Sequence, residues 1–233
     1  MTTEILPDAA TAARRAASHV AEVARAAVAA RGIANLAFSG GQTPAAMLRA
    51  LTLLDVPWHA LHVFQVDERV APPNSDARNV AQLENSLVMQ GVLAAERLHT
   101  MPVEGPDLAA GASKYAKLLS ELAGSPPVLD LVHLGLGEDG HTASLFADDP
   151  VLNVTDRDVA VSAEHSGYRR MTLTLPLLAR ARGVMWLVTG AAKARVLARM
   201  MRGDTSLPAT RVPTERAILF ADLAAAMPIE VRT

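Results

Sequence analysis

Along nearly the whole chain, short aliphatic and β-branched runs alternate with helical stretches, and this alternation limits the fold more than any other feature. It is typical of α/β proteins, in which helices cover both faces of a largely parallel sheet. We therefore predict a Rossmann-like α/β fold, with an antiparallel excursion where two strand-like runs follow one another at 149–176. The predicted strands cover 33–39, 61–68, a short run near 98, 128–137, 158–163, 170–176, 183–190 and 216–222, and the predicted helices include 44–54, the second part of 74–89, 114–122 and 191–201.

The composition excludes several functional classes for a protein with such a fold. The 233 residues suit one α/β domain over 1–233, and the absence of cysteine excludes disulfides, thiolate metal sites and cysteine nucleophiles. A net charge of -2 and an aromatic share of 3% argue against a nucleic-acid partner. No apolar stretch reaches the roughly 20 residues of a membrane span. We expect a cytoplasmic protein, monomeric or a small homo-oligomer, whose partner is a small molecule.

The first thirty residues are rich in alanine and arginine, a composition that also occurs in transit peptides. However, Glu4, Asp8 and Glu22 interrupt the basic residues, and valine and alanine recur at helical spacing between 20 and 28. We predict instead the first helix of the domain, with Asp8 or Thr11 near its N-cap.

A predicted strand runs directly into the glycine-rich segment 39–44, which is followed by a predicted helix. In α/β sheets ligands bind at the carboxyl ends of strands, and a helix N-terminus after flexible glycines offers free N–H groups to an anion. Ser39, Gly40, Gly41 and Thr43 are therefore candidates for a phosphate cradle. A simple glycine-rich turn is the alternative, and the segment is not a P-loop because that motif's spacing and lysine are missing.

Three charged residues, Asp67, Glu68 and Arg69, end the next predicted strand. The two carboxylates could act as acid or base, and the guanidinium suits a phosphate or a neighbouring carboxylate. A charged strand end held by a salt bridge gives the same pattern, and this motif alone favours that simpler interpretation.

The segment that ends the strand at 128–137 and continues to His141 contains the GxGxxG spacing of dinucleotide-binding folds. Glu138 and Asp139 oppose that interpretation, because they would face a pyrophosphate at short range. Asp139 and His141 instead have the spacing of a histidine base oriented by a carboxylate, and imidazole is well suited to general-base catalysis near pH 7. A hydrogen-bonded loop histidine without catalytic function is the alternative.

Further cations accompany the later strands. Arg169 and Arg170 begin a strand-like run, with a solvated charged face as the alternative. Lys193 lies in the first turn of a predicted helix, where a cation opposes the helix dipole and an anion would compensate for it. The spacings typical of metal ligands are absent around His141 and the carboxylates, so we predict neither a metal nor a cofactor.

Taken together, four segments resemble the 6-phosphogluconolactonase family in order and spacing. They are Ser-Gly-Gly-Gln-Thr-Pro from Ser39, Asp-Glu-Arg from Asp67, Gly-Leu-Gly-Glu-Asp-Gly-His-Thr-Ala-Ser-Leu-Phe from Gly135, and Arg-Arg-Met-Thr-Leu-Thr-Leu-Pro from Arg169; the segment ending at Lys193 resembles a Gly-x-x-Lys element. The resemblance runs from about 36 to 193 and implies an α/β sheet related to that of glucosamine-6-phosphate isomerase. Ala147 is a departure, since the family usually has proline there.

The resemblance implies hydrolysis of 6-phosphoglucono-1,5-lactone to 6-phosphogluconate in the oxidative pentose phosphate pathway. It implies that His141 activates the water and that Asp139 orients it. A lactone is already reactive, so one positioned base, a phosphate clamp and charge stabilisation of the developing oxyanion can account for catalysis. The substrate-binding residues that it implies are Ser39, Gly40, Gly41, Thr43 and Arg69, with Arg170 and Lys193 as further phosphate ligands and with Asp67 and Glu68 shaping the site.

Two other functions fit parts of this pattern. Related aminosugar-phosphate isomerases or deaminases carry a glutamate five residues after the histidine, and Phe146 stands at that position here. A non-catalytic sugar-phosphate sensor would usually carry a DNA-binding segment, and we find neither room for one before Leu36 nor a basic patch.

Overall fold

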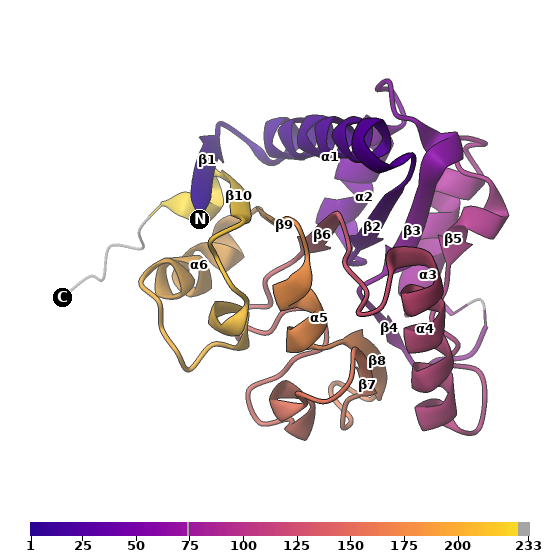
Figure 1. Cartoon of the computed structure of the whole chain (residues 1–233). Helices are drawn as coiled ribbons and strands as arrows, with labels where there is room; N and C mark the ends of the chain where they lie inside the picture. Colours follow the sequence, from indigo (N-terminus) through magenta and orange to yellow (C-terminus); the bar gives the residue numbers. More distant parts are fainter. Residues whose placement is uncertain (74, 228–233) are drawn as a thin grey trace.

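The computed structural model describes residues 1–73 and 75–227, and its main feature is a seven-stranded sheet (Figure 1). The strand order is β1-β10-β9-β6-β2-β3-β5, and each neighbouring pair runs parallel. The predicted parallel α/β sheet is therefore confirmed. The seven strands are β1 (Thr2–Leu6), β2 (Ala34–Phe38), β3 (Leu61–Gln65), β5 (Leu98–His99), β6 (Leu131–Leu134), β9 (Val184–Val188) and β10 (Ala217–Asp222).

Helices cover both faces of this sheet. Alternate residues of the central strands point to opposite faces, so that Leu36 and Phe38 of β2 join one core and Ala37 joins the other. Because both faces are covered, every residue of β2, β6 and β9 is buried, which explains their continuous apolar runs. One core packs α1 (Ala9–Arg31), α2 (Gln42–Leu51) and α3 (Asn79–Leu83), and the other packs α4 (Leu108–Ala123), α5 (Leu175–Arg180), α6 (Ala194–Met201) and α7 (Leu223–Ala226).

The first helix begins as predicted, because the Oδ1 atom of Asp8 accepts a hydrogen bond from the backbone N–H of Thr11 at 2.7 Å. It ends at Gly32, whose φ of 76° lies in the left-handed region. The buried face consists almost entirely of small side chains, which explains the alanine-rich composition and lets α1 lie against α2 and β10. These buried residues are Ala12, Ala13, Ala16, Ala17, Val20, Ala21, Ala24 and Ala27.

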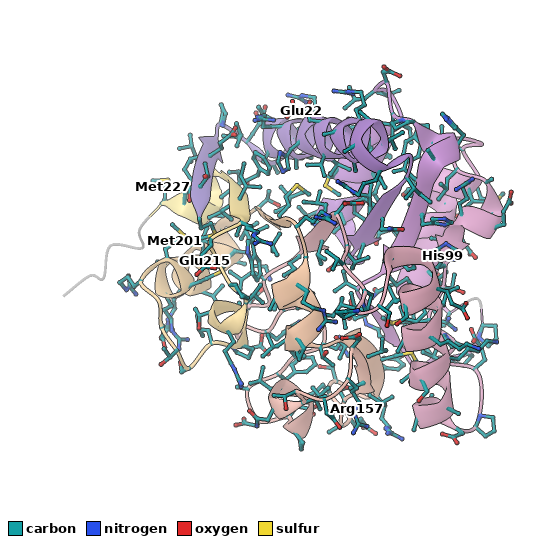
Figure 2. The ribbon with its side chains drawn as sticks, viewed as in Figure 1. Glu22, His99, Arg157, Met201, Glu215 and Met227 are labelled. Carbon is teal, nitrogen blue, oxygen red and sulfur yellow. The ribbon has the colours of Figure 1, made fainter. Side chains whose placement is uncertain are left out.

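The antiparallel excursion expected at 149–176 is part of a second sheet, which has the order β4-β8-β7. Its strands are β4 (Asp67–Arg69), β7 (Val159–Val161) and β8 (Arg170–Leu173). The single strand expected at 61–68 is thus wrong, since the chain leaves the large sheet after Gln65. Val66 joins the two sheets: its N–H donates to the carbonyl of Phe38 at 3.1 Å, and its carbonyl accepts from the N–H of Leu173 at 2.9 Å. Figure 2 shows Glu22 of α1 and Arg157, next to the small sheet, at opposite ends of the molecule.

Several helix boundaries differ from those expected. The helix within 74–89 is the short α3 followed by a π-helical turn at Glu84–Val88, and α4 begins at Leu108 because Asp107 caps it. β1 has no counterpart among the predicted strands, and its single neighbour in the described structure is β10. No helix among the described residues has the length and apolar character needed to cross a membrane.

Candidate active site

A cavity of about 220 Å³ lies beyond the carboxyl ends of four neighbouring strands, β9, β6, β2 and β3. The loops that follow these strands supply most of its walls, and the small sheet supplies the rest. Ligands of open parallel sheets bind at this edge. The predicted site residues that line the cavity are Ser39, Gly40, Asp67, Arg69, His141, Arg170 and Lys193.

His141 and Asp139 form a hydrogen-bonded pair beside the cavity. The Nδ1 atom of His141 lies 2.6 Å from Oδ1 of Asp139, which also accepts the backbone N–H of His141 at 3.1 Å. Burial alone would raise the pKa of Asp139, but the hydrogen bonds and charge of His141 outweigh burial and hold that pKa below its usual range. An ionised Asp139 keeps the ring proton on Nδ1, which leaves Nε2 with a lone pair for proton transfer.

The backbone beside this pair requires glycine. A Cβ atom on Gly137 would lie 2.2 Å from Nδ1 of His141 and 2.6 Å from Oδ1 of Asp139. Gly137 also closes the turn, because its N–H donates to the carbonyl of His141 at 2.8 Å. Gly137, the middle glycine of the GxGxxG spacing, therefore serves the approach of the imidazole to the backbone.

Two arginines face one another across the small sheet. Arg69 of β4 and Arg170 of β8 are direct partners in the antiparallel register, where like charges are destabilising. Burial, and then the charge of Arg69, lowers the pKa of Arg170. Nη1 of Arg69 donates to the carbonyl of Ala77 at 2.9 Å, whereas the buried Nε of Arg170 has no hydrogen-bond partner among the described residues. An anion between the two guanidinium groups would relieve their repulsion.

Lys193 brings a third cation to the same cavity, from the segment that follows β9. It ends a 3-10 turn, Ala191–Lys193, which follows β9 and leads into α6. Its Nζ atom lies 3.9 Å from Oε1 of Glu138, so the ammonium group extends toward the loop that carries His141. The expected helical first turn at Lys193 is therefore a 3-10 turn, and its side chain reaches the cavity.

Asp67 places a buried carboxyl group in the cavity wall. Its Oδ2 atom accepts a hydrogen bond from Oγ of Ser144 at 2.7 Å, and Oδ1 accepts one from Nδ2 of Asn79 at 3.3 Å. Burial raises the pKa of Asp67, although the Ser144 hydrogen bond and the charge of Arg170 oppose the rise. Among the described residues, no group of three or more histidine, aspartate or glutamate side chains is arranged to hold a metal ion.

Glu68 does not reach the cavity, although it was predicted to shape the substrate site. Its side chain is fully buried and accepts the backbone N–H groups of Arg69 at 2.7 Å, Asn79 at 2.8 Å and Val80 at 2.9 Å. Nε of Arg78 lies 3.2 Å from the same carboxylate. Glu68 therefore holds the start of α3 against β4, and it fixes two lining residues without contacting the cavity itself.

The glycine-rich segment reaches the cavity with its first two residues. The hydroxyl of Ser39 donates to the carbonyl of His133 at 3.1 Å, so its own proton is already used inside the fold. Gly40 passes so close to Asn79 that a Cβ atom would lie 2.2 Å from Oδ1 of that residue. This close approach explains why glycine stands at position 40.

The other two members of the expected phosphate cradle lie outside the cavity wall. The N–H of Gly41 donates to Oε1 of Gln82 at 2.6 Å, and Oγ1 of Thr43 lies 3.0 Å from Oγ1 of Thr189. These contacts tie the start of α2 to α3 and to the loop after β9. Gly41 and Thr43 thus hold the loops of the site together without lining the cavity.

Sequence reasoning missed the contacts that Asn79 and Ser144 make with Asp67. Asn79 lines the cavity, but it lies in a polar stretch without periodicity, and its role depends on contacts with Gly40 and Asp67. Ser144 lies three residues after His141, is fully buried and donates to Asp67.

A parallel sheet with a three-cation cavity at its carboxyl edge, next to a histidine–aspartate pair, defines an α/β protein with a site for a small anionic molecule. The family model for "Glucosamine-6-phosphate isomerases/6-phosphogluconolactonase" matches residues 7–220. The 6-phosphogluconolactonase of Synechocystis sp. is 39% identical over 175 residues, which cover 73% of this chain and 72% of the relative. That of Mycobacterium tuberculosis is 36% identical over 219 residues, covering 88% and 89%. The chain belongs to the glucosamine-6-phosphate isomerase/6-phosphogluconolactonase family.

Solved structures agree with this assignment. The 6-phosphogluconolactonase from Trypanosoma cruzi is 25% identical, with a TM-score of 0.85 over 97% of this chain and 95% of that structure. A monomeric glucosamine-6-phosphate deaminase gives a TM-score of 0.80 over 97% and 99%, at 16% identity, and this likeness shows the fold alone. The resemblance to the 6-phosphogluconolactonase family seen in four sequence segments is thus confirmed.

Proposed function

We propose that this chain hydrolyses 6-phosphoglucono-1,5-lactone to 6-phosphogluconate, the lactonase step of the oxidative pentose phosphate pathway. The observation that carries the proposal is the placement of the His141–Asp139 pair and three cations around one cavity. A phosphorylated lactone needs a base for the attacking water and positive charge for its phosphate. The relatives named 6-phosphogluconolactonase at 36% and 39% identity support the same activity.

His141 acts as the general base in this proposal. Its Nε2 atom takes a proton from a water molecule, whose oxygen attacks the carbonyl carbon of the lactone. The bond from that carbon to the ring oxygen then breaks, and the ring oxygen keeps the electron pair. It takes the proton from Nε2 of the His141 imidazolium to become a hydroxyl, which restores the neutral base. Asp139 fixes the ring through Nδ1–H and stabilises the imidazolium ion. A positioned base contributes about 10²–10⁴-fold to the rate.

Arg69 and Arg170 hold the phosphate, and Lys193 adds a third positive group. A dianion between the two guanidinium groups forms charge-assisted hydrogen bonds and removes the repulsion across the β4–β8 pair. Ser39, Gly40 and Asp67 shape the wall beside the sugar. Gly41, Thr43 and Glu68 support these residues without lining the cavity, through the contacts described above.

The test is to mix the protein with freshly prepared 6-phosphogluconolactone and to follow acid release against the spontaneous rate. Glucosamine-6-phosphate serves as a parallel substrate, because the family also contains isomerases. We expect acid release well above the spontaneous rate and no ammonia from glucosamine-6-phosphate. A spontaneous rate with the lactone, or turnover of the aminosugar alone, would overturn the proposal.

A further inference from the structure

Three aromatic rings lie in a row that begins at His141 in the cavity wall and continues through Phe146 to His165. The ring centroid of Phe146 lies 4.5 Å from that of His141 and 3.8 Å from that of His165. The planes of Phe146 and His165 differ by 17°, so these two rings are stacked face to face. The guanidinium carbon of Arg170 lies 5.3 Å from the Phe146 centroid. One phenyl ring therefore contacts both the proposed base and a proposed phosphate ligand.

The outer ring of this row is fixed by a buried carboxylate. Nε2 of His165 lies 2.8 Å from Oδ2 of Asp149, whose side chain is 1% exposed. Asp149 is held in turn by the backbone N–H groups of Val151 at 2.9 Å and Ala163 at 2.8 Å. The N–H of Asp149 donates to the carbonyl of Phe146 at 3.2 Å. Asp149 thus fixes the His165 ring through its carboxylate and the Phe146 backbone through its own N–H.

We propose that Phe146, backed by the His165–Asp149 pair, is a positioning residue that holds the His141 imidazole and the Arg170 guanidinium in fixed places relative to each other. This inference rests on the proposed function, and it assigns roles to three residues outside the cavity lining. Phe146 is buried and contacts the cavity residues from behind, so it acts through them and not on the substrate.

The physical reason lies in how few contacts restrain the base. Asp139 fixes Nδ1 of His141, but a single hydrogen bond leaves the ring free to rock about that atom. His141 is 29% exposed, so packing from the solvent side is weak. The Phe146 ring supplies the opposing surface, and aromatic pairs at this separation attract beyond simple burial. Arg170 gains a cation–π contact from the same ring.

The first test compares Phe146→Leu with Phe146→Tyr. Leucine keeps an apolar side chain but loses the flat ring, whereas tyrosine keeps the ring. Phe220→Leu is the matched control, because Phe220 also contacts a histidine ring, at 5.7 Å, and an arginine guanidinium, at 5.3 Å, on the far side of the sheet. We expect Phe146→Leu to lower kcat by about two- to tenfold, with a smaller rise in KM, while the other two variants stay near the wild type.

The second readout is independent of turnover. The ring ¹⁵N shifts of His141, assigned by comparison with His141→Asn, report how much of the ring carries its proton on Nδ1. We expect Phe146→Leu to lower that fraction and Phe146→Tyr and Phe220→Leu to preserve it. The inference is overturned if Phe146→Leu leaves kcat and the His141 shifts unchanged, if it lowers kcat without moving those shifts, or if Phe220→Leu lowers kcat equally.

If Phe146→Leu does not fold, a third variant tests the same inference. His165→Gln retains a side-chain N–H donor for Asp149 but removes the stacked ring, at a position that is partly exposed. We expect the same change in the His141 shifts. Failure of the proposed function can be distinguished from failure of this inference. A wild-type protein without lactonase activity would contradict the proposed function, whatever the His141 shifts show.

Discussion

Proton and charge positions at single atoms decide what the cavity can do. Nδ1 of His141 is held by Asp139, so the chemistry falls to Nε2. Arg69 and Arg170 stand opposite each other on neighbouring strands and repel in the absence of an anion. Asp67 is buried among these charges with two hydrogen bonds to its carboxylate. Each of these three arrangements gives a prediction for a single substitution.

His141→Asn keeps some hydrogen bonding but cannot accept the proton from water. We expect kcat to fall by about 10²–10⁴-fold while substrate binding stays nearly intact, because the phosphate ligands lie elsewhere. Single-turnover hydrolysis with the spontaneous rate subtracted measures the change. A variant that keeps more than about a tenth of kcat has lost less than about 1.4 kcal/mol, which would make His141 a structural residue.

Arg69→Ala removes one of the two guanidinium groups that face the proposed phosphate position. We expect a strong rise in KM for the phosphorylated lactone and a much smaller change in the slow hydrolysis of unphosphorylated gluconolactone. The comparison of the two substrates is the measurement, since it isolates the phosphate contact. Equal losses on both substrates would show that Arg69 does not bind the phosphate.

Asp67→Asn tests whether the buried negative charge of Asp67 destabilises the fold. Burial raises the folded pKa of Asp67 above its unfolded value, so its stabilising contribution is complete below the unfolded pKa and is lost as pH rises through the folded pKa. The ionised group therefore destabilises the fold at neutral pH. We expect Asp67→Asn to raise Tm at pH 7 by about 2–4 °C, the shift for about 1 kcal/mol, and the gain to vanish toward acid pH.

The readout for Asp67→Asn is thermal unfolding followed by the fluorescence of the buried Trp186 between pH 4 and 8. Asp67→Ala is the contrasting variant, because it leaves Ser144 and Asn79 without their acceptor. We expect that variant to lower Tm at every pH. A lower Tm for Asp67→Asn at pH 7 would show that the ionised carboxylate stabilises the fold.

At the scale of elements, the site depends on how loops and strand ends meet. The runs before Ser39, Gly135 and Thr189 could be predicted as strands, because buried parallel strands are continuously apolar. The break at Val66 could not, since the apolar pattern continues through it and only pairing with Leu173 reveals the change of sheet. Contacts such as those of Asn79, Gln82 and Phe146 join distant segments, and no local pattern records them.

Gly40→Ala tests the contact between the loop after β2 and the start of α3. The new Cβ would lie 2.2 Å from Oδ1 and 2.9 Å from Cβ of Asn79, so one element must shift. We expect a loss of about 1–3 kcal/mol in the free energy of unfolding, as for other overpacked sites. Urea unfolding measures it, together with a fall in kcat/KM because both residues line the cavity.

The Gly40→Ala, Asn79→Gly double variant separates this clash from other effects. Removing the Asn79 side chain frees the space that the new methyl group needs. We expect the double variant to lose less stability than the sum of the two single variants, with a coupling of about 0.5–3 kcal/mol. Additive losses in the free energy of unfolding would show that there is no steric clash between the two residues.

On the scale of the whole molecule, the cavity gathers segments that lie far apart in the chain. Its lining comes from 39–40, 67, 69, 79, 135–137, 141, 143, 170 and 193, which the fold brings to one edge of the parallel sheet. The alternation of strands and helices and three of these lining segments could be predicted from the sequence, because each of the three segments follows a recognisable strand. The single domain over 1–233, the cytoplasmic location and the oligomeric state stay predictions.

The assembled site also gives a prediction about metals. Its charged groups are three cations and one carboxylate, a set suited to an anion and not to a divalent cation. We expect lactonase activity to survive prolonged treatment with a chelator. The assay compares treated and untreated protein, and a large loss that one added divalent ion restores would contradict this prediction.

The placement of β1 beside β10 has a consequence for the protein during its synthesis. A nascent chain that has emerged from the ribosome as far as Met201 already contains every residue of the cavity lining. Among the described residues, however, β1 has no neighbouring strand until residues 217–222 follow, because β10 lies between β1 and β9. β1 is thus synthesised long before the strand with which it pairs, and the edge of β10 stays open to other strands until β1 closes it.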